Sequence, residues 1–187
     1  MMRPFARTRR FLRDRGGLAA IEFAFVAPIL ILAYFGVAEL CGAMLAQRKT
    51  SHVASAIGDL TSQYSAPAPS DINNFFAAGQ TIMSPSDTTT LKMRISAVQE
   101  NAAGTAASVI WSCASSNWAV LAKTTPETLP QVNMIAAGQS VIMAETQYTY
   151  SSPMSYLLPS VFTYSNVFYL RPRIVDPIPD PGTSPCN

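Results

Sequence analysis

The sequence has few of the side chains on which most enzyme chemistry depends. It contains one histidine, His52, three cysteines, and only 13% charged residues in a chain of 187, about half the usual charge content of a soluble protein. A Ser–His–acid arrangement needs its imidazole in a cleft, whereas His52 follows an apolar stretch, in a helical pattern typical of a surface position. No Cys/His set has the spacing of a metal site, and the glycines form no phosphate-binding loop. The sequence therefore predicts no enzyme, no metal site and no cofactor.

The acidic residues beyond the apolar stretch are scattered and suggest no acid–base pair. Glu100 lies beside a turn, Glu127 lies in a proline-containing loop, and Glu145 lies on a strand. A strand carboxylate such as Glu145 is buried or paired in some proteins but is more commonly exposed to solvent. A membrane-tethered hydrolase is the enzyme alternative, and these residues give it little support.

Positive charge is concentrated at the N-terminus. Six of the 13 Lys and Arg residues precede Gly17, with Asp14 the only acid among them, so the remainder of the chain carries net negative charge. A basic arm could bind nucleic acid, but basic residues beside an apolar helix also mark its cytoplasmic side. We expect residues 1–17 to be a basic cytoplasmic leader that can contact anionic lipid headgroups, with no nucleic-acid partner.

The stretch from Gly17 to Ala46 carries only two ionisable acids, Glu22 and Glu39. At about 1.5 Å per residue, the 21 residues Leu18–Ala38 span roughly 31 Å, close to the hydrocarbon thickness of a bilayer. Residues 18–46 are therefore predicted to form one transmembrane helix. A cleaved signal peptide fits less well, because its apolar region is usually shorter.

The helical pattern continues past the membrane. Val53, Ile57, Leu60 and Tyr64 recur at helical spacing, so one helix is expected over Leu18–Gln63. The following residues predict an α+β domain over 47–187, with an antiparallel sheet of about four strands and a proline-rich tail from Pro172. Its expected helix follows Ser70-Asp71 and carries Ile72, Phe75, Phe76, Ile82 and Met83. The expected strands are Leu91–Ala97, Ser108–Cys113, Ser140–Tyr150 and Val161–Leu170, with a turn at Asn101–Ala106 and a turn or short helix at 152–159.

The three cysteines lie in different surroundings. Cys41, in or at the end of the membrane helix, is expected to be a small apolar core residue. Cys113 ends a strand and Cys186 is the penultimate residue. An oxidising compartment would permit a Cys113–Cys186 disulfide that holds the tail on the sheet; the alternative is two free thiols.

The apolar stretch and its leader resemble a known class. Gly17 followed by Leu18–Phe23, after a short basic leader, is similar to the processing site of type IV pilin-like proteins, which a prepilin peptidase cuts after the glycine. The longer block Gly16–Pro28, with Phe35–Glu39, resembles the opening of TadE-like pilus assembly proteins. Looser similarities extend the resemblance over most of Arg13–Arg173: Ile95–Val98, Trp111–Cys113, Ala137–Ile142 with Glu145 and Tyr148, and Leu170–Arg173.

The resemblance implies a minor pilin or pseudopilin of the tight-adherence (Flp, type IVc) pilus. Cleavage would fall between Gly17 and Leu18, although many pilins have Phe where Leu18 stands. Glu22 would neutralise the α-amine of an adjacent subunit; alternatively, it is an interfacial acid paired with Arg13 or Arg15. Pro28 and Glu39 are further features of the helix. The implied partners are other pilins, the peptidase, the inner-membrane assembly platform and lipid.

The expected localisation is the bacterial inner membrane, as a single-pass protein with the domain in the periplasm or in the extracellular pilus. Two rival functions remain. The chain could be an uncleaved anchor or scaffold of the assembly platform, or a tip adhesin that presents aromatic residues to surfaces. The candidate aromatic residues, which are also plausible core residues, are Trp118, Tyr148, Tyr150 and Tyr164.

Overall fold

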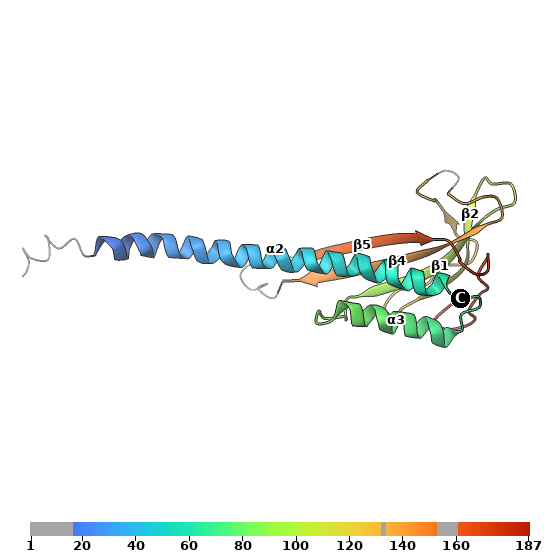
Figure 1. The fold of residues 1–187 in the computed structure, drawn as a ribbon, viewed down its shortest axis with the longest axis horizontal. Coiled ribbons are helices and arrows are strands. Elements are labelled where there is room, and N and C mark those ends of the chain that lie inside the picture. The colour runs from blue at the N-terminus through green and yellow to red at the C-terminus, as the bar shows by residue number, and fades with distance from the viewer. Residues whose placement is uncertain (1–16, 132–133, 153–160) are drawn as a thin grey trace, which may run out of the picture. The chain divides into compact units, whose positions relative to one another are not determined.

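The computed structural model describes residues 17–131, 134–152 and 161–187 (Figure 1). The chain divides into two units, Met1–Cys41 and Gly42–Asn187. Helix α2 (Leu18–Ser62) supplies the described part of the first unit and continues into the second. The other elements, all in the second unit, are α3 (Pro69–Met83), β1 (Lys92–Glu100), β2 (Ala107–Ala114), β3 (Pro126–Glu127), β4 (Ser140–Ser151) and β5 (Val161–Leu170).

Helix α2 confirms the predicted long helix and ends one residue before the predicted Gln63. The amide nitrogens of Gln63 and Tyr64 donate to Leu60 and Thr61 three residues back, a tightening common at helix ends. The buried positions of α2 all lie at or after Ala43 and recur every three or four residues, which is the pattern of one face packed on a core. They are Ala43, Ala46, Thr50, Val53, Ala54, Ile57, Gly58, Thr61 and Ser62.

Helix α3 begins earlier than the sequence suggests. We expected Ser70-Asp71 to start it, but Pro69 already occupies the first turn and Ala68 is the N-cap. Proline suits this position because it has no N–H to leave unpaired. The Asp71 carboxylate accepts the Ala68 amide at 2.9 Å. At the other end, Lys49 Nζ donates to the Ser84 carbonyl at 2.6 Å, placing a positive charge at the helix C-terminus.

The five strands form one antiparallel sheet in the order β3-β2-β1-β4-β5. Four of them match the predicted strands, and the fifth, β3, has two residues paired with Ala107 and Ser108. The predicted turn at 101–106 is confirmed: the Asn101 amide donates to Ala106, and Gly104 takes a positive φ of 68°. The turn or short helix expected at 152–159 falls, apart from Ser152, outside the described residues.

The main core lies between the sheet and the two helices. Its buried members include Ile57 of α2, Ile72 of α3 and Ile95 of β1. On β4, Ile142, Ala144 and Tyr148 are buried in this core and Tyr150 packs against it, so one face of the strand contributes all four.

Two glycines bring backbones close together in this core. A Cβ on Gly58 would lie 2.9 Å from Ala144 Cβ and 2.5 Å from Leu170 Cδ1, and one on Gly79 would lie 2.6 Å from Met93 Sδ. Each value is shorter than real Cβ contacts. Because Ala144 Cβ cannot move away, helix α2 approaches the sheet at a distance that only glycine permits, whereas a Cβ on Gly79 would require the flexible Met93 side chain to move.

A second, smaller core covers the opposite face of the sheet. It contains Val98, Val109, Val141 and Met143, closed by Ile135 from the segment before β4. Both faces of the sheet are therefore packed, which explains why β1, β2 and β4 are buried at consecutive positions and do not show strict alternation.

Candidate assembly segment

The first unit presents apolar side chains in every direction. From Leu18 to Leu40, each large hydrophobic residue is between 39% exposed, for Phe35, and 73% exposed, for Phe25. A helix that is apolar all round needs lipid or other helices around it. By length and composition, α2 is the one candidate membrane span among the described residues.

Gly17 forms the turn that precedes this helix, and its carbonyl accepts the Ile21 amide at 3.1 Å. A Cβ on Gly17 would meet no atom within 4 Å, and Leu18 is 58% exposed. Gly17 and Leu18 are thus both exposed residues in the described part of the chain. Arg13 and Arg15, the alternative partners for Glu22, lie outside the described residues.

The two carboxylates of the apolar stretch differ. Glu22 is exposed, one turn after Leu18. Glu39 is partly buried, and its Oε1 is enclosed without a hydrogen-bond partner in the described part of the chain. An ionisable side chain at bilayer depth costs at least about 2.5 kcal/mol without a partner, so each carboxylate calls for a cation or a donor.

Pro28 lies inside α2 without ending it. Proline has no N–H, so the carbonyl of Ala24 loses its helical partner at this point. Membrane helices tolerate this because neighbouring groups or local adjustments satisfy the freed carbonyl.

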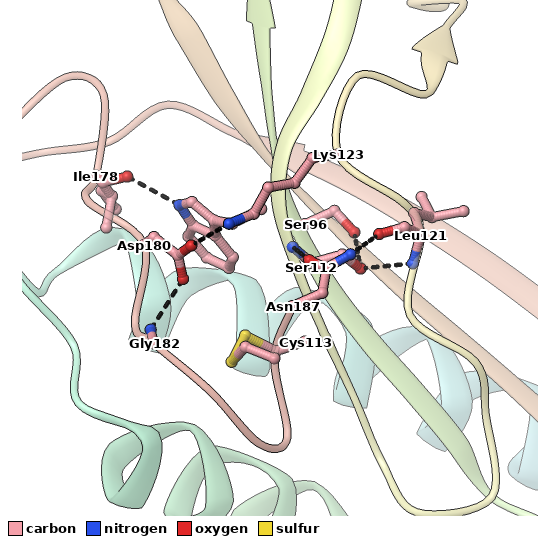
Figure 2. Close-up of a disulfide and its surroundings, with 11 residues drawn as sticks. Ser96, Ser112, Cys113, Leu121, Lys123, Ile178, Asp180, Gly182 and Asn187 are labelled. Carbon is pink, nitrogen blue, oxygen red and sulfur yellow. Dashed lines mark hydrogen bonds and ion pairs between the residues drawn. A yellow bond between two sulfur atoms is a disulfide. The ribbon is translucent and has the colours of Figure 1, made fainter.

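The predicted disulfide is present. Cys113 and Cys186 are bonded across 73 residues, and the two residues also form a short antiparallel bridge. Figure 2 shows the bond where β2 meets the C-terminal tail. Closing a loop of this length stabilises a fold by about 4 kcal/mol in the chain-entropy model.

Hydrogen bonds on both sides of the disulfide hold the tail in place. The Asn187 amide donates to the Ser112 carbonyl at 3.1 Å, and Asn187 Oδ1 accepts the Ser112 amide at 3.0 Å. Trp111 Nε1 donates to the buried Ile178 carbonyl at 2.8 Å. Lys123 pairs with Asp180 at 2.7 Å (Figure 2). The proline-rich tail is thus an extended segment at the edge of the sheet, fixed at its end and in its middle.

The sequence did not identify the charged cluster on the outer face of the sheet. Arg94 on β1 and Glu145 on β4 are opposite each other and form two hydrogen bonds of 2.6 and 2.9 Å. The Trp118 ring lies 4.5 Å from the Arg94 guanidinium. Glu145 is therefore paired with Arg94, and the more common expectation of a solvent-exposed strand carboxylate does not hold for it. Only the strand register could have revealed the pair.

Glu127 of β3 belongs to the same electrostatic environment. Burial raises the pKa of Glu127, the charge of Glu145 raises it further, and Arg94 partly offsets both. Burial also raises the pKa of Tyr169, with smaller contributions from Glu127 and Glu145. The charged side chains of Arg94, Glu127 and Glu145 are thus only partly exposed to water.

The remaining candidate residues lie apart from one another. His52 is exposed on α2, as expected for a surface position. Cys41 is an exposed free cysteine, so the prediction that it is a core residue is wrong for the packing within this chain. Of the four aromatic residues considered for adhesion, Tyr148 is buried, and Trp118, Tyr150 and Tyr164 are partly buried. This burial favours a packing role for them.

Residues 17–58 match the family model for TadE-like proteins. The predicted resemblance is confirmed over that range, which begins at the turn before α2 and includes Leu18, Glu22, Pro28 and Glu39. The TadE-like match ends within α2, before the sheet. No curated protein and no solved structure matches the chain. The TadE-like segment indicates a role in tight-adherence pilus assembly.

Proposed function

We propose that this chain is a minor pilin or pseudopilin of the tight-adherence (Flp, type IVc) pilus. The observation that carries the proposal is the TadE-like match over residues 17–58. It includes the part of α2, from Leu18 to Leu40, whose large apolar side chains are exposed in every direction, and it continues into the part that packs on the core. Such a helix can be surrounded by lipid before assembly and by neighbouring pilin helices after assembly, because both environments supply apolar contacts.

The proposed organisation is a cytoplasmic leader at 1–17, a transmembrane helix at 18–46 and an exported domain at 47–187. The basic leader supports this orientation through the positive-inside rule. The Cys113–Cys186 disulfide supports export, because such bonds persist in oxidising compartments. The bacterial inner membrane and the periplasm are the locations that fit both features. The chain acts by assembly with other pilins and the inner-membrane platform, and not by catalysis.

In this proposal the prepilin peptidase cuts between Gly17 and Leu18. Cleavage leaves an α-amine on Leu18 that the Glu22 carboxylate of a neighbouring subunit neutralises. In the low dielectric of packed helices this attraction exceeds its strength in water, so it favours one register between neighbours. The exposure of Glu22 leaves it available to a second chain.

Mass spectrometry of the protein extracted from membranes and from sheared pili tests the proposal. We expect a mature N-terminus at Leu18 and recovery of the protein with pili. An intact Gly16-Gly17-Leu18 junction in protein found only in membranes would instead support the uncleaved anchor.

Glu22→Ala tests the assembly carboxylate separately. We expect normal cleavage but a loss of the protein from pili of about tenfold or more, the effect of ~1.4 kcal/mol. Glu39→Ala is the matched comparison in the same helix, because it removes a carboxylate that the proposed pairing between subunits does not use. Unchanged incorporation of the Glu22→Ala variant would contradict the pairing.

A further inference from the structure

Strand β5 (Val161–Leu170) forms one edge of the sheet. It pairs with β4 over ten consecutive residue pairs without a register shift, and it contains no charged residue and no proline. No described strand pairs with its other side (Figure 1). Exposed edge strands are normally protected by charges, proline or bulges, and β5 has none of these.

The opposite edge of the same sheet is covered. Strand β3 pairs with the start of β2, and Thr124 and Thr125 exchange hydrogen bonds of 2.8 and 3.0 Å with Val109. At the far end, the Ala114 amide donates to Pro185 of the disulfide-bonded tail at 3.1 Å. One edge is thus protected by loops and a covalent bond, whereas no strand among residues 17–131, 134–152 and 161–187 pairs with the other edge.

The side chains of β5 are also unusually apolar for an exposed strand. Val161 is 67% exposed and Val167 is 42% exposed on one face, while Phe162 and Phe168 are 47% and 36% exposed on the other. An added strand would therefore gain apolar contacts on both faces as well as backbone hydrogen bonds.

We propose that the β5 edge accepts an extended, uncharged segment from a different protein of the same assembly, which adds a sixth strand to the sheet. This mode of recognition takes its affinity from main-chain hydrogen bonds and its specificity from alternate side chains. An uncharged partner is required because a charged side chain laid against Phe162 or Val167 would lose water without gaining an ion pair. The inference rests on the proposed function, which supplies neighbouring subunits.

A second copy of this chain fits the β5 edge poorly. Pairing of β5 with the other edge of a second copy is blocked, because that edge is already occupied. A two-fold pairing of β5 with itself is antiparallel, and the direction of α2 argues against it. Gly42 lies beside Tyr150, which pairs with Phe162 at the start of β5, and Gly58 lies beside Leu170 at its end.

The chain therefore enters the second unit next to the start of β5. An antiparallel pair would place the two entry points, at Gly42 of each copy, at opposite ends of the joined sheet. Two chains anchored in one membrane enter from the same side, so this arrangement is incompatible with the proposed membrane anchor.

Site-specific photocrosslinking in cells that make the full-length protein tests the proposal. A photoreactive residue replaces Ser165, an exposed position in the middle of β5, and, as a control, Ala102 in the exposed turn after β1. We expect an adduct from position 165 alone, with the crosslinked peptide of the other protein identified by mass spectrometry as an uncharged strand-forming segment.

Two variants provide the matched comparison. Val161→Lys with Val167→Lys adds charge to the β5 edge, and Ile174→Lys adds it to an apolar side chain that is 63% exposed just outside the strand. We expect the first to reduce the position-165 adduct by about tenfold or more, corresponding to ~1.4 kcal/mol, and the second to leave it unchanged. Thermal unfolding checks that both variants keep the folded domain.

The remaining outcomes separate this inference from the proposed function. An adduct between two copies of this chain, an adduct insensitive to the paired lysines, or no adduct in cells whose pili contain the protein would overturn the edge proposal alone. A lysine-sensitive adduct with another protein, from an uncleaved chain absent from pili, would support the edge and contradict the pilin assignment.

Discussion

One helix serves two different environments in this protein. Before Cys41, the large apolar side chains of α2 are all exposed. From Ala43 onward, one face of the same helix is buried, and the other positions are partly buried or exposed. The first part resembles a helix that takes its surroundings from outside the chain, and the second part resembles an ordinary core helix. Both parts are helical, so only the burial of their side chains distinguishes them.

The distribution of glycine follows the same division. A Cβ on Gly36 would meet nothing within 4 Å, whereas one on Gly58 would overlap Ala144 and Leu170. In the first part a glycine carries no packing constraint from this chain. In the second part a glycine sets how closely the helix approaches the sheet. The comparison predicts that equal substitutions in the two parts have unequal effects on the folded domain.

The largest expected effect comes from truncating a buried isoleucine. Ile57 is fully buried in the main core, while Ile29 is 66% exposed. Removing a buried aliphatic side chain loses its transfer energy and leaves a cavity, so Ile57→Ala should lower the free energy of unfolding by about 3 kcal/mol. Ile29→Ala is the matched control and should leave it unchanged, as measured by urea denaturation in detergent. Equal losses would show that the first part packs within the chain after all.

Enlarging a glycine should have a somewhat smaller effect of the same kind. Gly58→Val inserts methyl groups where Ala144 and Leu170 already lie, and overpacking of this kind costs about 2 kcal/mol. Gly36→Val changes helix propensity equally but meets no neighbour. We expect the melting temperature of the domain to fall only for Gly58→Val. A similar fall in both would attribute the effect to helix propensity and contradict the close approach.

Much of this architecture follows from periodicity. The apolar run, the helical spacing from Val53 to Ile57 and the alternation in residues 91–97 predicted the helix and the sheet, because each pattern reflects burial on one face. Short β3 was not predicted, since two residues that include Pro126 carry no strand pattern. The Cys113–Cys186 bond was predicted only as one of two alternatives, because sequence does not bring distant cysteines together.

The features that sequence did not predict depend on register and on approach between elements. Arg94 and Glu145 meet because β1 and β4 are aligned at that pair, and a shift by one residue would place them on opposite faces. The roles of Gly58 and Lys49 likewise depend on which element lies opposite. In the apolar part of α2, Glu22 was found from its position after Gly17, a signal carried entirely by the sequence.

The smallest expected effect concerns the outer face of the sheet, where burial acts on a charge rather than on apolar groups. Burial raises the pKa of Glu127 above its ordinary value of 4.5, so the folded state favours the protonated form. By linkage, this contribution to stability is fully present below the unfolded-state pKa and is lost as the pH rises through the folded-state pKa.

The Glu127→Gln variant stays neutral at every pH. Its free energy of unfolding should therefore exceed that of the unmodified protein at pH values above the folded-state pKa of Glu127, and the two should differ least in acid. The margin should be small because Glu127 is only partly buried. Urea denaturation from pH 4 to pH 8 measures the difference at each pH. A difference that grows toward acid would reverse the sign of the linkage and would indicate that the Glu127 carboxylate is stabilised as the anion, with Arg94 outweighing burial and Glu145.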